Sequence, residues 1–179
     1  GGADPGRQGR QPLTAGAPGE PGSAFQRLVA GLDYPMFVVT AAAAGERSGC
    51  LVGFASQCSI HPPRFVVWIS KANHTYGVAR RAGALGVHVL GGGDGGLAEL
   101  FGGETGDEVD KFARCAWHDG PEGVPVLDGA AGWFVGRVLD LLDTGDHLGF
   151  LLAPVDGLVR DEPALGFQDV VGLEPGHRP

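Results

Sequence analysis

Short runs of apolar, β-branched and aromatic residues dominate the middle of the chain, and Gly, Pro and Asp separate them. Branched and aromatic side chains pack well on a pleated surface, so these runs predict β-strands. Six runs have this character, and they lie at residues 36–40, 49–54, 65–70, 85–90, 133–139 and 147–153. Between them, residues 41–48 predict a hairpin connection and residues 143–146 predict a turn.

Helical periodicity is limited to short segments. Residues 25–32 carry apolar side chains at the spacing of a short amphipathic helix, and weaker helical patterns occur at 75–82 and 97–101, with a turn at 109–113. Because strands do not alternate regularly with long helices, a doubly wound parallel sheet is the weaker interpretation. The pattern predicts a mainly β protein, with about six strands in a closed or nearly closed barrel and a few short helices.

The two ends of the chain differ from this middle part. Residues 1–23 are rich in Gly and Pro and carry almost no large apolar side chains. Such a segment cannot bury enough surface to offset the entropy of ordering it. We therefore expect one domain at residues 24–168, a Gly/Pro-rich tail before it, and a C-terminal tail at residues 169–179.

Charge and cysteine content argue against several classes of protein. The net charge is -8 with only 13 Lys and Arg residues, whereas binding nucleic acid requires clustered cations. No apolar stretch approaches the length of about 18 residues that spans a bilayer, and no secretory signal is visible. The cysteines, Cys50, Cys58 and Cys115, include no Cys-x-x-Cys pair, and the histidines have no metal-ligand spacing. We therefore predict no disulfide framework and no metal site, and a reducing, cytoplasmic location.

The first candidate site is the segment at residues 49–63, GCLVGFASQCSIHPP. In this segment an apolar strand continues into small and polar residues and ends at two prolines. Small residues let a flat ring approach the main-chain amides, and Ser56, Gln57 and Ser59 add polar side chains. Taken alone, the composition of this segment favours the alternative, a polar barrel rim that binds nothing.

Two further segments carry candidate chemistry. Residues 70–76 leave a strand and enter a helix that Asn73 or Thr75 can cap, and the free N–H groups of a helix N-terminus suit a phosphate. The alternative is a capped helix with ordinary surface polar residues. At the last turn, Asp146 beside His147 can orient the imidazole and raise its proton affinity, although a histidine after a turn is often structural.

Taken together, in their order and spacing, these segments resemble the flavin reductase-like family, whose domain is the FMN-binding split barrel. The similarity extends from about Ala24 to Leu158. The segments that carry it are residues 35–40, 49–63, 70–75 and 87–90, the pair Lys111 and Phe112, and the triplet Gly145, Asp146 and His147.

The resemblance implies a six-stranded antiparallel split β-barrel of Greek-key topology, which holds FMN without a covalent bond. It implies that the flavin ring is bordered by Leu51, Val52, Gly53, Phe54, Ala55, Ser56, Gln57, Cys58 and Ser59. It implies that the ribityl-phosphate chain faces Ser70, Lys71, Asn73, His74 and Thr75, with Lys111 as a further anion contact. It assigns the catalytic role to His147 with Asp146, which would position the nicotinamide or handle a proton.

The activity implied by the resemblance is reduction of the bound flavin by NADH or NADPH, with electrons passing to free flavin or to a partner monooxygenase. The resemblance also implies a homodimer with the flavin near the subunit interface. Leu51, Val52 and Gly53 stand where the family commonly has Thr and Ser or Asn, and His88 stands in place of an Asn. FAD or a deazaflavin in place of FMN therefore stays open. The alternative function is a non-catalytic module that stores or carries a flavin and has no nicotinamide site.

Overall fold

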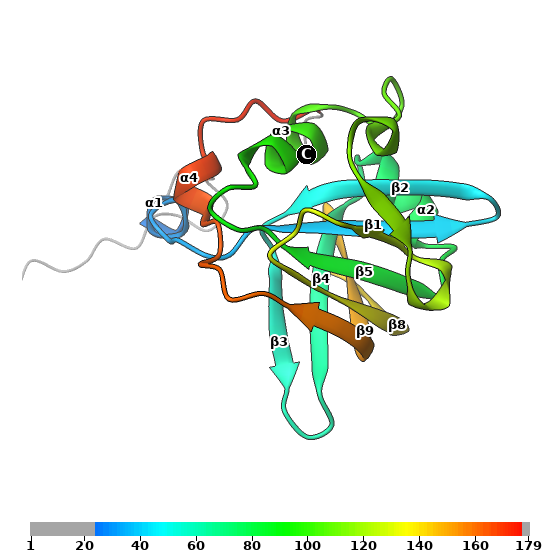
Figure 1. The fold of residues 1–179 in the computed structure, drawn as a ribbon. Coiled ribbons are helices and arrows are strands. Elements are labelled where there is room, and N and C mark those ends of the chain that lie inside the picture. The colour runs from blue at the N-terminus through cyan, green and yellow to red at the C-terminus, as the bar shows by residue number, and fades with distance from the viewer. Residues whose placement is uncertain (1–23, 177–179) are drawn as a thin grey trace, which may run out of the picture. The chain divides into compact units, whose positions relative to one another are not determined.

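The computed structural model describes residues 24–176 (Figure 1). The chain divides into two compact units, Gly1–Leu32 and Asp33–Pro179. In the first unit, helix α1 (Ala24–Ala30) confirms the helix predicted at residues 25–32. The tail predicted at residues 1–23 lies outside the described residues, as do the last three residues of the tail predicted at 169–179.

The second unit is built on one antiparallel sheet of seven strands in the order β2-β1-β5-β8-β9-β4-β3 (Figure 1). The strands are β1 (Phe37–Ala43), β2 (Glu46–Val52), β3 (Ala55–Ser59), β4 (Arg64–Ser70), β5 (Ala84–Val89), β8 (Gly132–Asp143) and β9 (His147–Val159). The mainly β class with few helices is therefore confirmed, but the six-stranded barrel is corrected to an open sheet of seven strands. The additional strand is β3, a segment that lies outside the six predicted strand runs.

The sheet curls strongly, although its edge strands do not pair with each other. Strands β2 and β3 occupy opposite ends of the strand order, yet only Gly53 and Phe54 connect them along the chain. The three Cα-to-Cα steps from Val52 to Ala55 span at most about 11 Å, so the two edges of the sheet lie close together at this connection. The main-chain N–H of Trp68 in β4 donates to the Phe54 carbonyl at 2.8 Å, which continues the β3–β4 ladder up to the connection.

Shorter elements complete the described part of the chain. They are a two-stranded sheet of β6 (Trp117–Asp119) and β7 (Pro125–Leu127), the helices α2 (His74–Ala79), α3 (Gly95–Gly103) and α4 (Phe167–Val170), and the 3-10 turns η1 (Lys111–Arg114) and η2 (Pro121–Gly123). Helix α4 crosses the domain boundary expected at residue 168. Its Val170 is buried in a cluster with Leu165, and Leu173 packs against that cluster. Residues beyond 168 therefore also pack against the core of this unit.

Local turn chemistry sets the two hairpins that the pattern predicted. Between β1 and β2 the turn is reduced to Ala44 and Gly45, whose φ values of 52° and 80° are both positive. Two consecutive positive φ values match the twist of the flanking strands in a two-residue hairpin. The turn between β8 and β9 contains Gly145 at φ 123°, a region that favours glycine.

The core lies on both faces of β1, because successive side chains of a strand point to opposite faces. Val39 belongs to the cluster inside the curled sheet, with Ile69 and Phe150. Val38 belongs to a second cluster, which includes Phe101 of α3 and buried residues of the C-terminal segment. The described residues include no helix of the length and apolar character needed to cross a membrane.

Candidate functional site

A cavity of about 320 Å³ lies where β2 passes into β3. This volume is at the lower end of the range for small-molecule sites, about 300–1,000 Å³. The lining is mostly apolar, with a few polar groups, which is the usual character of such sites. The residues that line it are Tyr34, Met36, Cys50, Leu51, Val52, Gly53, Phe54, Trp68, Ser70, Asn73, Phe101, Gly102, His147, Phe167, Val170, Val171, Leu173 and Pro175.

Residues from all three segments singled out in the sequence line this one cavity. Leu51, Val52, Gly53 and Phe54 come from the first segment, Ser70 and Asn73 from the second, and His147 from the third. The pairing of β4 with β9 explains part of this, because it places Ser70 directly opposite His147. The assignment of these residues to a flavin stays a prediction, but the fold brings them together.

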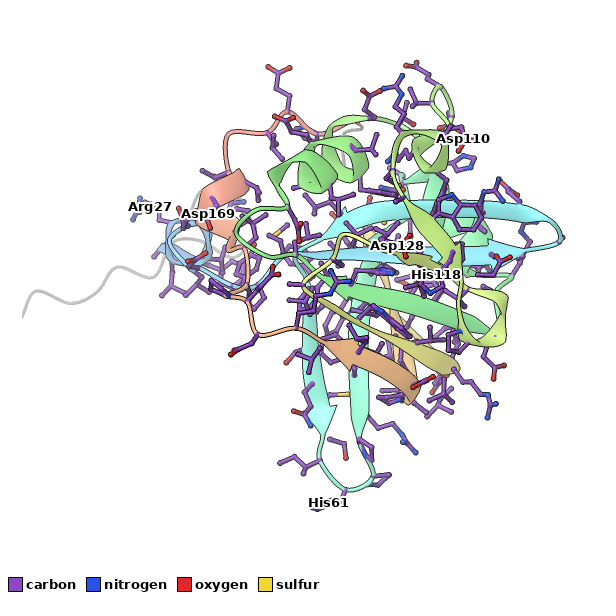
Figure 2. All side chains as sticks on the ribbon, viewed as in Figure 1. Arg27, His61, Asp110, His118, Asp128 and Asp169 are labelled. Carbon is purple, nitrogen blue, oxygen red and sulfur yellow. The ribbon has the colours of Figure 1, made fainter. Side chains whose placement is uncertain are left out.

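The other half of the predicted ring-binding segment lies elsewhere. Ala55, Ser56, Gln57, Cys58 and Ser59 form β3, which pairs with β4 in a hairpin that has His61 at its tip (Figure 2). These five residues do not line the cavity. The side chains of Ser56 and Gln57 bond to main-chain carbonyls of β3 itself. A strand rises about 3.3 Å per residue, so pairing with β4 carries each successive residue farther from the cavity.

His147 is a titratable side chain that lines the cavity, and the sequence predicted Asp146 as its partner. Its Nδ1 lies 2.7 Å from Oδ1 of Asp146, and its ring centroid lies 5.2 Å from that of Phe54. The hydrogen bond from His147 holds the pKa of the Asp146 carboxyl below its ordinary value. A neutral imidazole that donates from Nδ1 carries its lone pair on Nε2. The pair therefore presents an oriented imidazole at the cavity.

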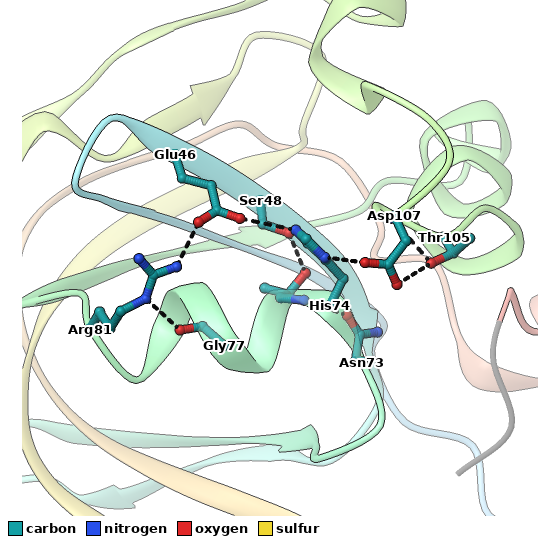
Figure 3. A network of polar contacts seen from close by, with 9 residues as sticks. Glu46, Ser48, Asn73, His74, Gly77, Arg81, Thr105 and Asp107 are labelled. Atoms are coloured by element: carbon teal, nitrogen blue, oxygen red, sulfur yellow. Dashed lines mark hydrogen bonds and ion pairs between the residues drawn. The ribbon is translucent and has the colours of Figure 1, made fainter.

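A polar network surrounds the start of α2 (Figure 3). The residues predicted to bind the phosphate make different contacts there. Asn73 caps the helix, since its Oδ1 accepts from the N–H of Thr75 at 2.9 Å. The Thr75 side chain is buried and its Oγ1 lies 2.8 Å from Oγ of Ser48. Ser70 and Asn73 line the cavity, but Thr75 does not. The hydroxyl of Thr75 thus contributes to packing α2 on β2.

His74 lies between two carboxylates in this network and does not line the cavity. Its Nε2 is 3.2 Å from Glu46 and its Nδ1 is 2.6 Å from Asp107 (Figure 3). Hydrogen bonds hold the pKa of both carboxyls below the ordinary value: chiefly the one from Arg81 for Glu46, and the one from His74 for Asp107. The geometry therefore gives His74 the role of joining α2, β2 and the loop after α3.

The two predicted lysines also lie outside the cavity lining. Lys71 forms an ion pair with Asp143 at 2.8 Å, near the turn between β8 and β9. Lys111 is buried, and its Nζ donates to the carbonyls of Gly49 and Phe101. The structure thus places the Lys111 ammonium among main-chain carbonyls of β2 and α3, and the anion contact that the resemblance implied stays a prediction.

Much of the cavity wall comes from residues that the sequence reasoning missed. Tyr34 and Phe167 stack with ring centroids 4.8 Å apart and planes 15° apart, and both line the cavity. Burial raises the pKa of the Tyr34 phenol. Phe101 lies on α3, and Leu173 lies in the segment assigned to a tail. No local pattern marked these residues, because only the packing of distant segments places them here.

Comparisons with known proteins agree with the geometry. The chain is 30% identical over 124 residues to the FMN reductase (NADH) RutF of Pseudomonas syringae pv. syringae, and the match covers 69% of each protein. Two solved structures share the fold at 23% identity. The NADH:FAD oxidoreductase SgcE6 of Streptomyces globisporus C-1027 matches with a TM-score of 0.74 over 80% of this chain and 86% of that one. The FMN-binding protein from Thermus thermophilus matches with a TM-score of 0.75 over 86% and 90%.

The strongest finding is a family model, described as the flavin reductase like domain, that matches residues 29–170. This range includes the lining residues of the cavity from Tyr34 to Val170, His147 among them. Because the match covers well over half of the sequence, the chain belongs to the family of flavin reductase like domains.

Proposed function

We propose that this protein is an NAD(P)H-dependent flavin reductase that binds FMN non-covalently in the cavity at the end of β2. The observation that carries the proposal is the single cavity shared by residues 51–54, by Ser70 and Asn73, and by His147. Membership of the family and the FMN reductase (NADH) name of a relative support FMN as the flavin and NADH as the donor. When bound, the flavin accepts a hydride from the nicotinamide and passes the electrons on.

The donors and surfaces of the cavity fit a flavin ring. The main chain at residues 51–54 offers amide and carbonyl groups to the polar edge of a flat ring. Phe54 and Trp68 offer aromatic faces, and the other apolar side chains of the lining exclude water. Ser70 and Asn73, which line the cavity, would hold the ribityl-phosphate chain through their polar side chains. Leu51 and Val52 contribute no hydroxyl, so main-chain contacts take a larger share than in relatives with Thr there.

The protein groups near the reacting atoms are His147 and Asp146. Asp146 accepts a hydrogen bond from Nδ1–H and so fixes the orientation of the imidazole. Nε2 is then the nitrogen that accepts or donates a proton, or contacts the nicotinamide amide. Phe54 packs against the imidazole and limits its rotation. In this arrangement the histidine positions the donor and the flavin supplies the redox chemistry.

The proposal extends to a homodimer in the cytoplasm, with electrons passing to free flavin or to a partner monooxygenase. Large apolar side chains exposed on β8 and β9 support self-association, because burial of apolar surface between subunits is favourable. These side chains are Leu139, Leu141, Leu142, Val155, Leu158 and Val159. Light scattering of the purified protein tests the dimer, and a monomeric mass would contradict it.

A second candidate function is a flavin carrier with no nicotinamide site. The absence of side-chain hydroxyls at Leu51, Val52 and Gly53 favours it, as does the name of the FMN-binding protein of Thermus thermophilus that shares the fold. The absorption spectrum of the protein as purified separates the two functions when NADH is then added. A yellow protein that oxidises neither NADH nor NADPH supports the carrier. Oxidation of NADH that depends on flavin supports the reductase.

A His147→Gln variant tests the assigned role within the reductase. We expect NADH oxidation at saturating FMN to fall about a hundredfold, as is usual for loss of a group that handles a proton or orients the substrate. His118→Gln is the matched control, because His118 also contacts an aspartate through Nδ1, at 2.6 Å from Asp128, but lies on β6 outside the cavity (Figure 2). Unchanged turnover of His147→Gln would remove this residue from the mechanism.

A further inference from the structure

Lys111 is a charged side chain in the interior next to the cavity, and the proposed chemistry does not use it. Only 4% of its surface is exposed. Its Nζ donates hydrogen bonds to the carbonyl oxygens of Phe101 at 3.1 Å and of Gly49 at 3.3 Å. Burying an ammonium is costly unless its hydrogens are bonded, and burial lowers the pKa of this one. The two hydrogen bonds therefore offset part of the cost of burying the ammonium of Lys111.

The two carbonyls belong to the elements that form one wall of the cavity. Phe101 lies in the last turn of α3, where carbonyl groups have no partner within the helix. A cation at that end also interacts favourably with the helix dipole. Gly49 lies in β2, which pairs with a strand on one side only. Lys111 therefore ties the end of α3 to the edge of β2.

The contact between α3 and β2 leaves little room for displacement. A Cβ on Gly102 would lie 2.7 Å from Cδ2 of Leu51, and a Cβ on Gly49 would lie 2.8 Å from the ring of Phe101. The main chains of the two elements thus approach each other through their glycines. Leu51, Phe101 and Gly102 line the cavity directly. A small shift of α3 would therefore change the width of the cavity.

We propose that Lys111 is a positioning residue for the flavin: its ammonium holds α3 against β2 and so sets the width of the slot for the ring, without touching the phosphate. This inference rests on the proposed flavin site. Densely packed interiors transmit displacements rather than absorbing them. A displacement of about 1 Å in a wall of a binding site is sufficient to misplace the bound ligand.

The test compares FMN with riboflavin, which has the same ring but no phosphate. Dissociation constants are measured by quenching of flavin fluorescence for wild type, Lys111→Met, Lys111→Arg and Arg114→Met. Arg114 is the matched control, because it is an exposed cation of the same turn that pairs with Glu104 at 3.1 Å. Visible circular dichroism of the bound flavin at saturation reports the geometry of the ring separately from affinity.

We expect Lys111→Met to weaken FMN and riboflavin by the same factor, about tenfold, since two main-chain acceptors lose their donor. The circular dichroism of the bound flavin should change as well. Lys111→Arg, which keeps the charge and the donors, should lose less, and Arg114→Met should match wild type. Weaker binding of FMN alone would assign Lys111 to the phosphate and overturn the proposal, as would unchanged binding of both flavins.

If Lys111→Met does not fold, the affinities for FMN and riboflavin are compared in Lys111→Arg instead. Acetylation of the wild type adds a second measurement. A buried positioning lysine should stay unmodified with and without FMN, whereas modification that FMN prevents would overturn the proposal. A wild-type protein that binds neither flavin would refute the proposed function itself, and binding by wild type with no effect of Lys111 would refute this inference alone.

Discussion

Acidification is expected to destabilise this protein through one buried imidazole, that of His88 in β5. His88 has no exposed surface. Its Nδ1 lies 3.0 Å from the carbonyl of Val38, and its Nε2 accepts the main-chain N–H of Leu127 at 3.0 Å. A carbonyl only accepts, so Nδ1 carries the proton and Nε2 is bare. A second proton would break the bond to Leu127 and bury a charge.

The size of this loss of stability follows from the difference in the pKa of His88 between the folded and the unfolded state. Burial lowers the pKa of His88 from 6.5 to about 4, and the hydrogen bond to Val38 offsets only part of this. The unfolded state therefore binds the proton more readily, so the contribution of His88 is complete above pH 6.5 and is lost as pH falls through about 4. Each tenfold difference in affinity is worth about 1.4 kcal/mol. The free energy of unfolding should thus fall by about 2.5 kcal/mol between about pH 7.5 and about pH 4.5.

Urea unfolding followed by tryptophan fluorescence measures this loss in wild type and in His88→Asn and His88→Gln. Neither variant titrates at this position, and each loses one of the two hydrogen bonds. At about pH 7.5 both should therefore be less stable than wild type by about 1–3 kcal/mol. Toward about pH 4.5 that deficit should shrink by about 2.5 kcal/mol, because only the wild type carries the imidazole. A deficit that is the same at both pH values, or an imidazole that titrates near 6.5 by NMR, would refute the reasoning.

Two further variants test the cavity wall and the loop beside it. Gly102→Ala places a Cβ 2.7 Å from a side chain of β2, so FMN affinity should fall about fivefold. Gly103→Ala meets nothing closer than 3.6 Å and should bind as wild type, and equal affinities of the two variants by calorimetry would contradict this account. Asp107→Asn weakens the 2.6 Å contact that anchors the loop in Figure 3, so amide hydrogen exchange in residues 104–110 should accelerate. Glu108→Gln is its control, and unaltered exchange in Asp107→Asn would show that the loop is held by other contacts.

Features that depend on neighbours along the chain could be predicted from the sequence. The strand runs, the turn at Gly145, and a helix cap at Asn73 or Thr75, which the structure places at Asn73, follow from side-chain shape and from local hydrogen bonding. The resemblance to the flavin reductase-like family, which the family comparison confirms, also rested on segments read in order. Strand β3 was missed for the opposite reason. Its small polar residues have no strong strand preference, and pairing with β4 makes it a strand.

Which polar side chains face the cavity was decided only by the tertiary structure. His74, Thr75 and Lys111 have the residue types of phosphate ligands, yet each finds a partner elsewhere: carboxylates for His74, Ser48 for Thr75, and main-chain carbonyls for Lys111.

The curl of the sheet brings Phe101, Phe167 and the C-terminal segment against β2. The type of a residue determines which groups its side chain is able to bind. Burial and the order of the strands determine which groups lie next to it, because the neighbouring side chains come from segments far apart in the chain.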